Sequence, residues 1–382
     1  MKILSLCATP EYTGPAELML EDAVSLRAAG HEVTVGFDGR REGTMRSFVE
    51  AAGLPIQEGL DLCRIGRPLP IARDVLALRR WLREGRYDTV HVRFSHDHHV
   101  ALLAMAGLER RSLRLVRSCE LLENVAPGWH RTVPFAGTDR FVVPSGDHAE
   151  GLIRNHGVSS DRIDVVRGRV DAARYAPGPS GLRAELGITE EAPVVGIVSR
   201  MKPDRRHPDL VAAFARALAS VPSAWLVVVG RGEGEPLVRA AAERAGVGHR
   251  VRFAGYRTGD ELADAYRGFD VKAWLASGND GTCRAVLEAM ASGCAVLGGR
   301  FGAVAESVVD GVTGRLCDPG DHEATGAALA WLLADRARAA SLGEAGRHRV
   351  LAHYTPERRA ADVLAVYERA WTDPARAPSH GL

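Results

Sequence analysis

The amino-acid sequence alternates between short β-rich runs and segments with helical spacing along its whole length. In the first half, apolar runs of four to six residues are separated by stretches whose apolar residues recur at helical intervals. This alternation is typical of βαβ units, which build a parallel sheet with helices on both faces. The strands expected here are Ile3–Cys7, Glu32–Phe37, Thr89–Phe94, Leu113–Arg117 and Arg140–Pro144, with helices at Gly14–Ala29, Ile71–Arg83, His98–Leu108 and Asp147–His156.

The second half repeats the pattern, after a break at Ala172–Pro193 that is rich in Pro and Gly and lacks strong periodicity. A chain of 382 residues has room for two domains. We therefore predict an α/β architecture with doubly wound domains at residues 1–175 and 186–355, facing each other across a cleft. A C-terminal helix at 356–372 is expected to cross back to the first domain. The second set of strands is Val194–Ser199, Ala224–Val229, Val251–Ala254, Val271–Trp274 and Ala295–Gly298, with helices at Pro208–Ala219, Glu235–Ala245, Asp260–Tyr266, Arg284–Ala291 and Glu323–Leu333.

Charge and cysteine content narrow the function classes. The 49 basic and 48 acidic residues nearly cancel, which argues against bulk nucleic-acid binding. No signal peptide and no apolar stretch near the ~20 residues of a membrane span stand out. We expect a cytoplasmic protein, at most peripheral at the inner face of the membrane. The cysteines have neither C-x-x-C nor zinc spacing, so free thiols and no bound metal are expected at Cys7, Cys63, Cys119, Cys283, Cys294 and Cys317.

The basic residues are unevenly distributed. The stretch from Arg64 to Arg117 holds 12 arginines against five acidic residues, a local charge of +7. Within it, Leu76–Arg83 mixes apolar side chains with arginines. Two interpretations stay open: an amphipathic helix packed on the sheet, or a helix that also contacts a membrane surface or an anionic acceptor.

Two loops at strand ends carry polar groups suited to an anionic or hydroxylated ligand, and two further loops depart from the dinucleotide-binding pattern. Asp280 and Glu288 flank a helix start at which the backbone N–H groups of Gly281, Thr282 and Cys283 suit a diphosphate. The alternative is an N-cap aspartate and a solvated glutamate. Arg200 and Arg205 follow a strand, where they suit a phosphate clamp, or are surface arginines of an Arg-rich chain. Gly230 and Gly232 form a tight turn that departs from G-x-G-x-x-G, and the first loop, Thr9–Gly14, lacks that pattern too, so a classical dinucleotide site is not predicted.

A histidine cluster marks the first half. His96, Asp97, His98 and His99 follow the Thr89–Phe94 strand, and histidine is the usual acid or base near neutral pH. Adjacent histidines do not share a helix face, which disfavours a metal site. A capping role for Asp97 is the structural alternative.

Together these motifs resemble the retaining GT-B glycosyltransferases of family 4. The E-x7-E pattern of that family reads here as Asp280-x7-Glu288, and its R-x4-K pattern as Arg200-x4-Arg205. The G-x-G turn at Gly230–Gly234 and the Glu306-x4-Gly311-x2-Gly314 run also match. The resemblance covers most of the chain and is strongest from about 194 to 335.

The resemblance implies transfer of a hexose-type sugar, with retention, from a UDP- or GDP-linked donor to a hydroxyl of a saccharide, lipid-linked or natural-product acceptor. It implies no metal cofactor and a role in bacterial polysaccharide biosynthesis. Arg200 and Arg205 would bind the diphosphate, Glu288 the ribose, and Asp280 the donor sugar. The remaining donor-binding positions would be Gly14, Gly230, Gly232, Gly281, Thr282, Cys283 and Glu306.

Three departures from the family pattern affect these roles. Asp280 replaces Glu, Arg205 replaces Lys, and Glu120 stands near the place where many relatives carry a histidine. The acceptor-side candidates are therefore Glu120 and the His96–His99 cluster, of which we take His98 as the catalytic candidate. Two alternatives to transfer stay open: a non-hydrolysing sugar-nucleotide epimerase and a donor-binding module without transfer activity.

Overall fold

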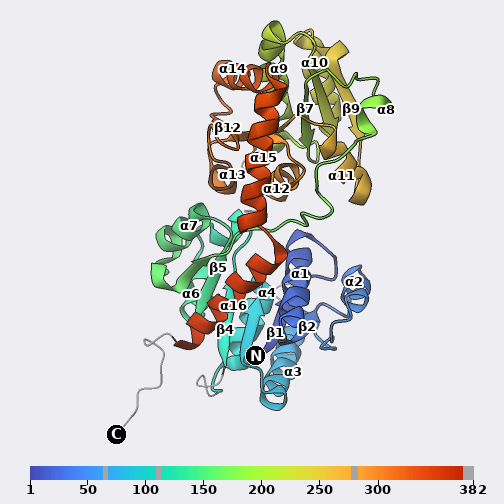
Figure 1. Ribbon diagram of the computed structural model, residues 1–382. Coiled ribbons are helices and arrows are strands. Elements are labelled where there is room, and N and C mark those ends of the chain that lie inside the picture. The colour runs from blue at the N-terminus through green and yellow to red at the C-terminus, as the bar shows by residue number, and fades with distance from the viewer. Residues whose placement is uncertain (63–67, 109–112, 277–282, 373–382) are drawn as a thin grey trace. The chain divides into compact units, whose positions relative to one another are not determined.

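Each half of the chain folds around a parallel six-stranded sheet, as the alternating pattern predicts. The computed structural model describes residues 1–62, 68–108, 113–276 and 283–372. They form two units: Met1–Arg167 together with the chain from Pro356, and Gly168–Thr355 (Figure 1). The expected α/β fold of doubly wound domains is thus confirmed.

The first unit has strand order β2-β1-β3-β4-β5-β6. Successive residues of β1 point to opposite faces: Ile3 packs beneath α1 and α16, and Leu4 packs beneath α3 and α4. Both faces are therefore covered, which explains why the strands are almost wholly buried. The strands are β1 (Lys2–Cys7), β2 (Glu32–Phe37), β3 (Thr89–Val92), β4 (Arg114–Ser118), β5 (Arg140–Val143) and β6 (Ile163–Val165). The helices are α1 (Gly14–Ala28), α2 (Met45–Ala51), α3 (Pro68–Gly85), α4 (Ser95–Met105), α5 (Leu122–Val125), α6 (Trp129–Ala136), α7 (Gly146–His156), η1 (Ser160–Arg162) and α16 (Pro356–Thr372).

The second unit has strand order β12-β11-β10-β7-β8-β9. One face packs against α11, α12 and α13, and the other against α9, α10 and α14. The strands are β7 (Val194–Val198), β8 (Trp225–Val229), β9 (Val251–Gly255), β10 (Val271–Trp274), β11 (Ala295–Gly299) and β12 (Gly314–Cys317). The helices are α8 (Leu182–Glu185), η2 (Pro203–Arg205), α9 (His207–Ser220), α10 (Glu235–Arg244), η3 (Gly248–Arg250), α11 (Gly259–Arg267), α12 (Arg284–Ala291), α13 (Gly302–Ser307), α14 (His322–Leu333) and α15 (Arg336–His353).

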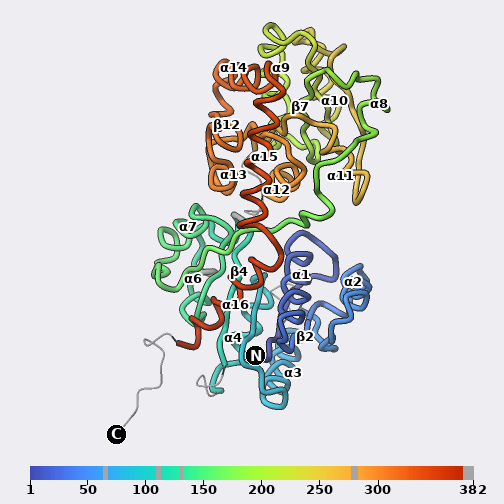
Figure 2. The backbone as a smooth tube through the Cα atoms, in the orientation of Figure 1, coloured from blue at the N-terminus to red at the C-terminus, as the bar shows by residue number. Residues whose placement is uncertain are grey.

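The last helix returns to the first unit, as expected for the chain end. Val363, Val366 and Tyr367 of α16 pack in the same core as Ile3 of β1. Helix α16 therefore lies against α1, although the two helices are far apart in the sequence (Figure 2).

Several predicted boundaries shift for identifiable reasons. The strand expected at Thr89–Phe94 ends at Val92, and α4 begins at Ser95 rather than His98. The cause is Asp97, whose carboxylate accepts the backbone N–H groups of Arg93 and Phe94 and so turns the chain into the helix. The second unit begins at Gly168, ahead of the expected residue 186, because Val170 and Tyr175 already pack in its core.

Helix α15 was not predicted, because its small and charged residues show no apolar stripe. A glycine explains its packing. A Cβ on Gly343 would lie 1.8 Å from the carbonyl oxygen of Gly293, so only glycine lets the helix approach that turn. Strands β6 and β12 were also not predicted, because β6 has only three residues and β12 contains glycine and arginine in place of an apolar run.

Candidate active site

The two candidate phosphate-binding arginines lie in one loop at the carboxyl end of β7. Arg200 is exposed, whereas the Arg205 side chain, at the end of η2, is only 10 % exposed. The glycine turn after β8 shapes this loop. A Cβ on Gly230 would lie 2.0 Å from the Ser199 carbonyl oxygen, and one on Gly232 would lie 2.4 Å from that of Met201. In the structure these two glycines therefore position the arginine loop, and direct contact with a ligand stays a prediction.

Sequence reasoning missed two side chains beside Arg205. Lys272 and Trp274 both lie on β10, the strand next to β7, and their side chains share one face of the sheet. The Trp274 ring centroid lies 5.6 Å from the Arg205 guanidinium carbon and 5.1 Å from Lys272 Nζ. The available signal was a lysine inside an otherwise apolar strand, in a chain with only three lysines.

Burial lowers the pKa values of two groups in this cluster, Lys272 and His207. Lys272 is fully buried and Nζ donates to the adjacent Ala273 carbonyl at 3.0 Å. Desolvation lowers the pKa of Lys272 to about 7. Desolvation, reinforced by the charges of Lys272 and Arg205, lowers the pKa of His207 to about 4, so this buried histidine is neutral at neutral pH. At neutral pH the positive charge of this cluster is therefore carried by Arg205 and by the protonated fraction of Lys272.

We expect Lys272→Met to stabilise the protein at acidic pH. The unfolded chain keeps the Lys272 proton up to its ordinary pKa of 10.5, whereas the folded chain releases it near pH 7. The free energy of unfolding therefore rises with pH between about 7 and 10.5, where only the unfolded chain holds the proton. Below pH 7 the folded protein contains the buried charged lysine, and its stability is lowest. Urea unfolding at pH 6 should show a gain of about 1–4 kcal/mol that shrinks toward pH 8.5. The exposed Lys202→Met is the control, and an unchanged or lower stability of Lys272→Met at pH 6 would contradict the assignment.

Glu288, the candidate ribose ligand, lies on α12 and is largely buried. Its Oε2 accepts a hydrogen bond from the Tyr266 hydroxyl at 2.8 Å, and its Oε1 lies 3.8 Å from Arg284 Nε. Helix α12 packs on the face of the sheet that carries Trp274, and the charge of Glu288 opposes the lowering of the Lys272 pKa. The hydrogen bond from Tyr266 thus holds the carboxylate in one orientation.

The rest of the predicted donor site is only partly described. Cys283 caps α12 with a left-handed backbone (φ 48°) and is buried. Glu306 lies half-buried on α13, where its carbonyl accepts a hydrogen bond from Arg349 at 2.9 Å. The predicted positions outside the described residues are Asp280, Gly281 and Thr282.

On the acceptor side, His98 lies in the interior rather than at a surface. It is 1 % exposed, and its Nε2 hydrogen-bonds the Thr138 hydroxyl at 2.8 Å. Burial holds the pKa of His98 well below its usual range. Asp97, also buried, caps α4 and lies 3.5 Å from Arg117, so the capping interpretation describes its contacts. These contacts favour a packing role for both residues.

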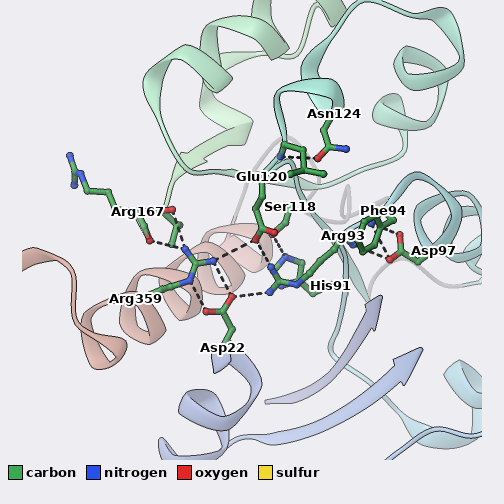
Figure 3. Close-up of polar contacts among 12 residues, drawn as sticks. Asp22, His91, Arg93, Phe94, Asp97, Ser118, Glu120, Asn124, Arg167 and Arg359 are labelled. Carbon is green, nitrogen blue, oxygen red and sulfur yellow. Dashed lines mark hydrogen bonds and ion pairs between the residues drawn. The ribbon is translucent and has the colours of Figure 1, made fainter. Parts of the chain in front are cut away.

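Glu120, the other acceptor-side candidate, belongs to a buried network of four charged groups (Figure 3). Arg93 ion-pairs with both Glu120 and Asp22, and Arg359 of α16 donates to Asp22 at 2.6 Å. Arg359 also donates to the carbonyl of Arg167 at 2.7 Å. Two carboxylates and two guanidinium groups balance, so the network ties α16 to α1 and to the ends of β3, β4 and β6. These ion pairs account for the burial of Glu120, and no contact with an acceptor substrate is needed to explain it.

Gly14 opens α1, where a Cβ would meet no heavy atom within 4 Å. Packing therefore does not require glycine there, and the closeness of Gly14 to a ligand stays a prediction.

Beside this loop a pocket of about 310 Å³ is lined in part by Arg40, Arg41 and Arg46. Arg41 pairs with buried Asp38 and Arg46 donates two hydrogen bonds to Glu58, so these arginines already have acidic partners.

The described residues contain no group of three or more His, Cys, Asp or Glu side chains placed to hold a metal ion. Nor does the described part contain a helix that combines the length and apolar character of a membrane span. Five cysteines in this part of the chain are buried free thiols, whereas Cys63 lies outside it.

Comparison with known families matches both halves of the chain. Residues 13–174 match the model described as Glycosyltransferase Family 4, and residues 181–349 match Glycosyl transferases group 1. The D-inositol 3-phosphate glycosyltransferase of Rhodococcus opacus is 33 % identical over 340 residues, which span 82 % of this chain and 74 % of that protein. The protein of the same name from Nocardia farcinica is 31 % identical over 309 residues, or 75 % of this chain and 68 % of that protein.

Solved structures share the fold. A glycosyltransferase from Rickettsia africae superimposes with a TM-score of 0.83 at 16 % identity, covering 97 % of this chain and 99 % of that one. Anabaena HepE in complex with UDP-glucose superimposes with a TM-score of 0.74 at 21 % identity, covering 96 % and 99 %. Taken with the two parallel sheets, these matches show that the chain belongs to the group 1 and family 4 glycosyltransferases and has the GT-B fold.

Proposed function

We propose that this enzyme transfers a hexose, with retention and without a metal ion, from a UDP- or GDP-linked sugar to a hydroxyl group of an acceptor. The observation that carries the proposal is the cluster formed by the loop after β7 and the side chains of β10. Arg205 and Lys272 there supply positive charge, and Glu288 supplies a fixed carboxylate on the following helix. This is the chemistry that a nucleoside diphosphate needs.

The proposed mechanism is electrostatic stabilisation of the leaving group. As the bond between the anomeric carbon and the diphosphate breaks, negative charge grows on the departing phosphate. Guanidinium groups that are already in place stabilise this charge without reorganisation, and arginine does so through paired hydrogen bonds. In this scheme Arg200 and Arg205 bind the diphosphate, Glu288 accepts the ribose hydroxyls, and Asp280 contacts the donor sugar.

The acceptor class is a saccharide, a glycolipid or a natural product that carries a free hydroxyl. The relatives named D-inositol 3-phosphate glycosyltransferases support a phosphorylated cyclitol as the first acceptor to assay. The HepE complexes with UDP and UDP-glucose support UDP-glucose as the first donor.

The direct test is an assay of UDP- and GDP-hexoses with D-inositol 3-phosphate and with saccharide acceptors, in the presence of EDTA. Formation of an α-linked product from an α-linked donor, observed by NMR, supports the proposal. Conversion of the nucleotide sugar without acceptor would indicate an epimerase instead. Nucleotide-sugar binding with no turnover on any acceptor would favour a binding module.

Glu288→Gln should weaken nucleoside-diphosphate binding at least tenfold. The substitution keeps the shape of the side chain but replaces charge-assisted hydrogen bonds from the ribose by neutral ones, and each charge-assisted bond contributes about 1.5–3 kcal/mol. Titration calorimetry measures the change. Tyr266→Phe is the control because it removes the 2.8 Å hydrogen bond to Glu288 but leaves the carboxylate. Equal affinity of Glu288→Gln and wild type would exclude the ribose assignment.

We further propose that α3 contacts an anionic membrane surface peripherally. Leu69 and Leu76 are 77 % and 67 % exposed on this helix, and Arg73, Arg80 and Arg83 are exposed beside them. Apolar anchors among arginines suit an interfacial helix. Co-sedimentation with vesicles of anionic phospholipid, compared with neutral vesicles, tests this contact, and equal recovery with both would refute it.

A further inference from the structure

Two side-chain donors next to the arginine loop are buried without a hydrogen-bond partner among the described residues. They are Trp274 Nε1 and Arg205 Nε. Trp274 is only 8 % exposed, so solvent does not replace the missing acceptor. Buried indole N–H groups normally find a partner, and an unpaired one costs free energy. Within the part of the chain that the structure describes, this donor therefore lacks the acceptor that its burial calls for.

A third donor belongs to the same cluster. Lys272 Nζ has three protons, and the hydrogen bond that the structure shows for it goes to the neighbouring carbonyl of Ala273. The Trp274 ring lies within 5.6 Å of the Arg205 guanidinium carbon and within 5.1 Å of Lys272 Nζ. Because β7 and β10 pair in parallel, Trp274 at the end of β10 and the loop after β7 lie at the same edge of the sheet.

Among the residues that the structure describes, the charge of this cluster is positive and poorly compensated. Asp204 lies 3.6 Å from Arg205 Nε, but its side chain is half-exposed to solvent. Glu288 acts on Lys272 from a distance while it accepts a hydrogen bond from Tyr266. His207, which contributes to the same surroundings, is neutral. A buried positive charge without a close buried carboxylate is costly unless an anion arrives.

We propose that Trp274 and Lys272 complete the phosphate-binding part of the donor site, the indole N–H donating to a phosphate oxygen and Lys272 adding positive charge behind it. The inference rests on the proposed function, since the phosphate is that of a nucleoside diphosphate. It assigns the unpaired indole N–H of Trp274 and the charge of Lys272 to the same ligand as Arg205. Neither residue belongs to the motifs by which the chain resembles its family.

Trp274→Phe is the discriminating variant, because phenylalanine keeps an aromatic ring between the two cations but lacks the N–H. Binding of UDP and GDP to wild type is measured first by titration calorimetry, and the nucleotide that binds is used with its nucleoside. We expect the Kd of the diphosphate to rise about tenfold in Trp274→Phe. The Kd of the nucleoside, measured by displacement, should stay within twofold, because the lost contact is to phosphate.

Trp225→Phe is the matched control. Trp225 opens β8 and also lies under two cations, with Arg250 and Arg252 at 5.0 and 4.2 Å from its ring, but at the opposite, amino end of the strands. Trp225→Phe should leave the affinities for the diphosphate and for the nucleoside unchanged. Lys272→Met should, like Trp274→Phe, raise the Kd of the diphosphate several-fold and leave the Kd of the nucleoside unchanged.

The outcomes separate this inference from the proposed function. If wild type binds neither UDP nor GDP, the proposed function fails and the inference fails with it. If wild type binds one of them but Trp274→Phe matches wild type, the inference alone is overturned. It is also overturned if Trp274→Phe weakens diphosphate and nucleoside equally, because the loss would then not involve phosphate.

Discussion

Arg205→Ala is expected to lower kcat about 100- to 1,000-fold while the KM for the nucleotide sugar changes only several-fold. A preorganised donor aimed at developing charge acts mainly in the transition state, and removal of one such group costs about 10²–10³ in kcat. Arg205 is well placed for this role because its side chain is 10 % exposed and lies against Trp274. Exposed Arg200 should show the same direction of effect but a smaller one.

Initial-rate kinetics with a saturating acceptor measure both parameters. Arg205→Lys tests whether the paired guanidinium geometry matters or charge alone suffices, because lysine keeps the charge but loses the planar fork. Arg216→Gln is the control, since Arg216 lies on α9 and pairs with Glu323 at the surface. A rise in KM with kcat unchanged would show that Arg205 binds the ground state and transition state equally, against the mechanism proposed here.

Arg359→Met should destabilise the first unit by about 3–5 kcal/mol. Arg359 is 2 % exposed, bonds Asp22 through two nitrogens and also binds the carbonyl of Arg167. Removing one partner leaves a buried carboxylate with less compensation, and this is the costly way to disturb a buried ion pair. Because Arg359 is in the first turn of α16, we expect faster hydrogen exchange of this helix together with a lower urea midpoint.

Its neighbour in the chain offers a matched control. Arg358 pairs with Asp362 at 3.2 Å, but its side chain is 58 % exposed, so Arg358→Gln should change stability by no more than about 0.5 kcal/mol. Asp22→Asn combined with Arg359→Met should cost less than the sum of the single substitutions, because both remove the same interaction. Equal stability of Arg359→Met and Arg358→Gln would contradict the role assigned to the network.

Local sequence patterns were sufficient to predict the two sheets and the position of the arginine loop. Strands such as β1 and β8 are continuous apolar runs, and buried parallel strands have this composition wherever they occur. Arg200 and Arg205 follow such a run directly, so their position at a sheet edge follows from the order of residues along the chain. The alternation of strands and helices is likewise a local property of the sequence.

Other elements depended on partners that are far away in sequence. Histidine at position 98 looks polar and accessible, but Thr138 and Phe135 enclose it in the fold. Helix α15 shows no apolar stripe, because its contact with Gly293 uses the absence of a side chain at Gly343. Neither feature has a local signature.

By itself, the sequence determined the doubly wound architecture and the family, because strand and helix periods and short motifs are written in neighbouring residues. The tertiary structure decided which charges are buried and with which partners. Glu120 and Arg359, 239 positions apart in the numbering, share one buried network, and Lys272 and Arg205 flank one indole ring. The physical reason is that desolvation and charge pairing depend on all surrounding elements at once, and these meet only when the chain has folded.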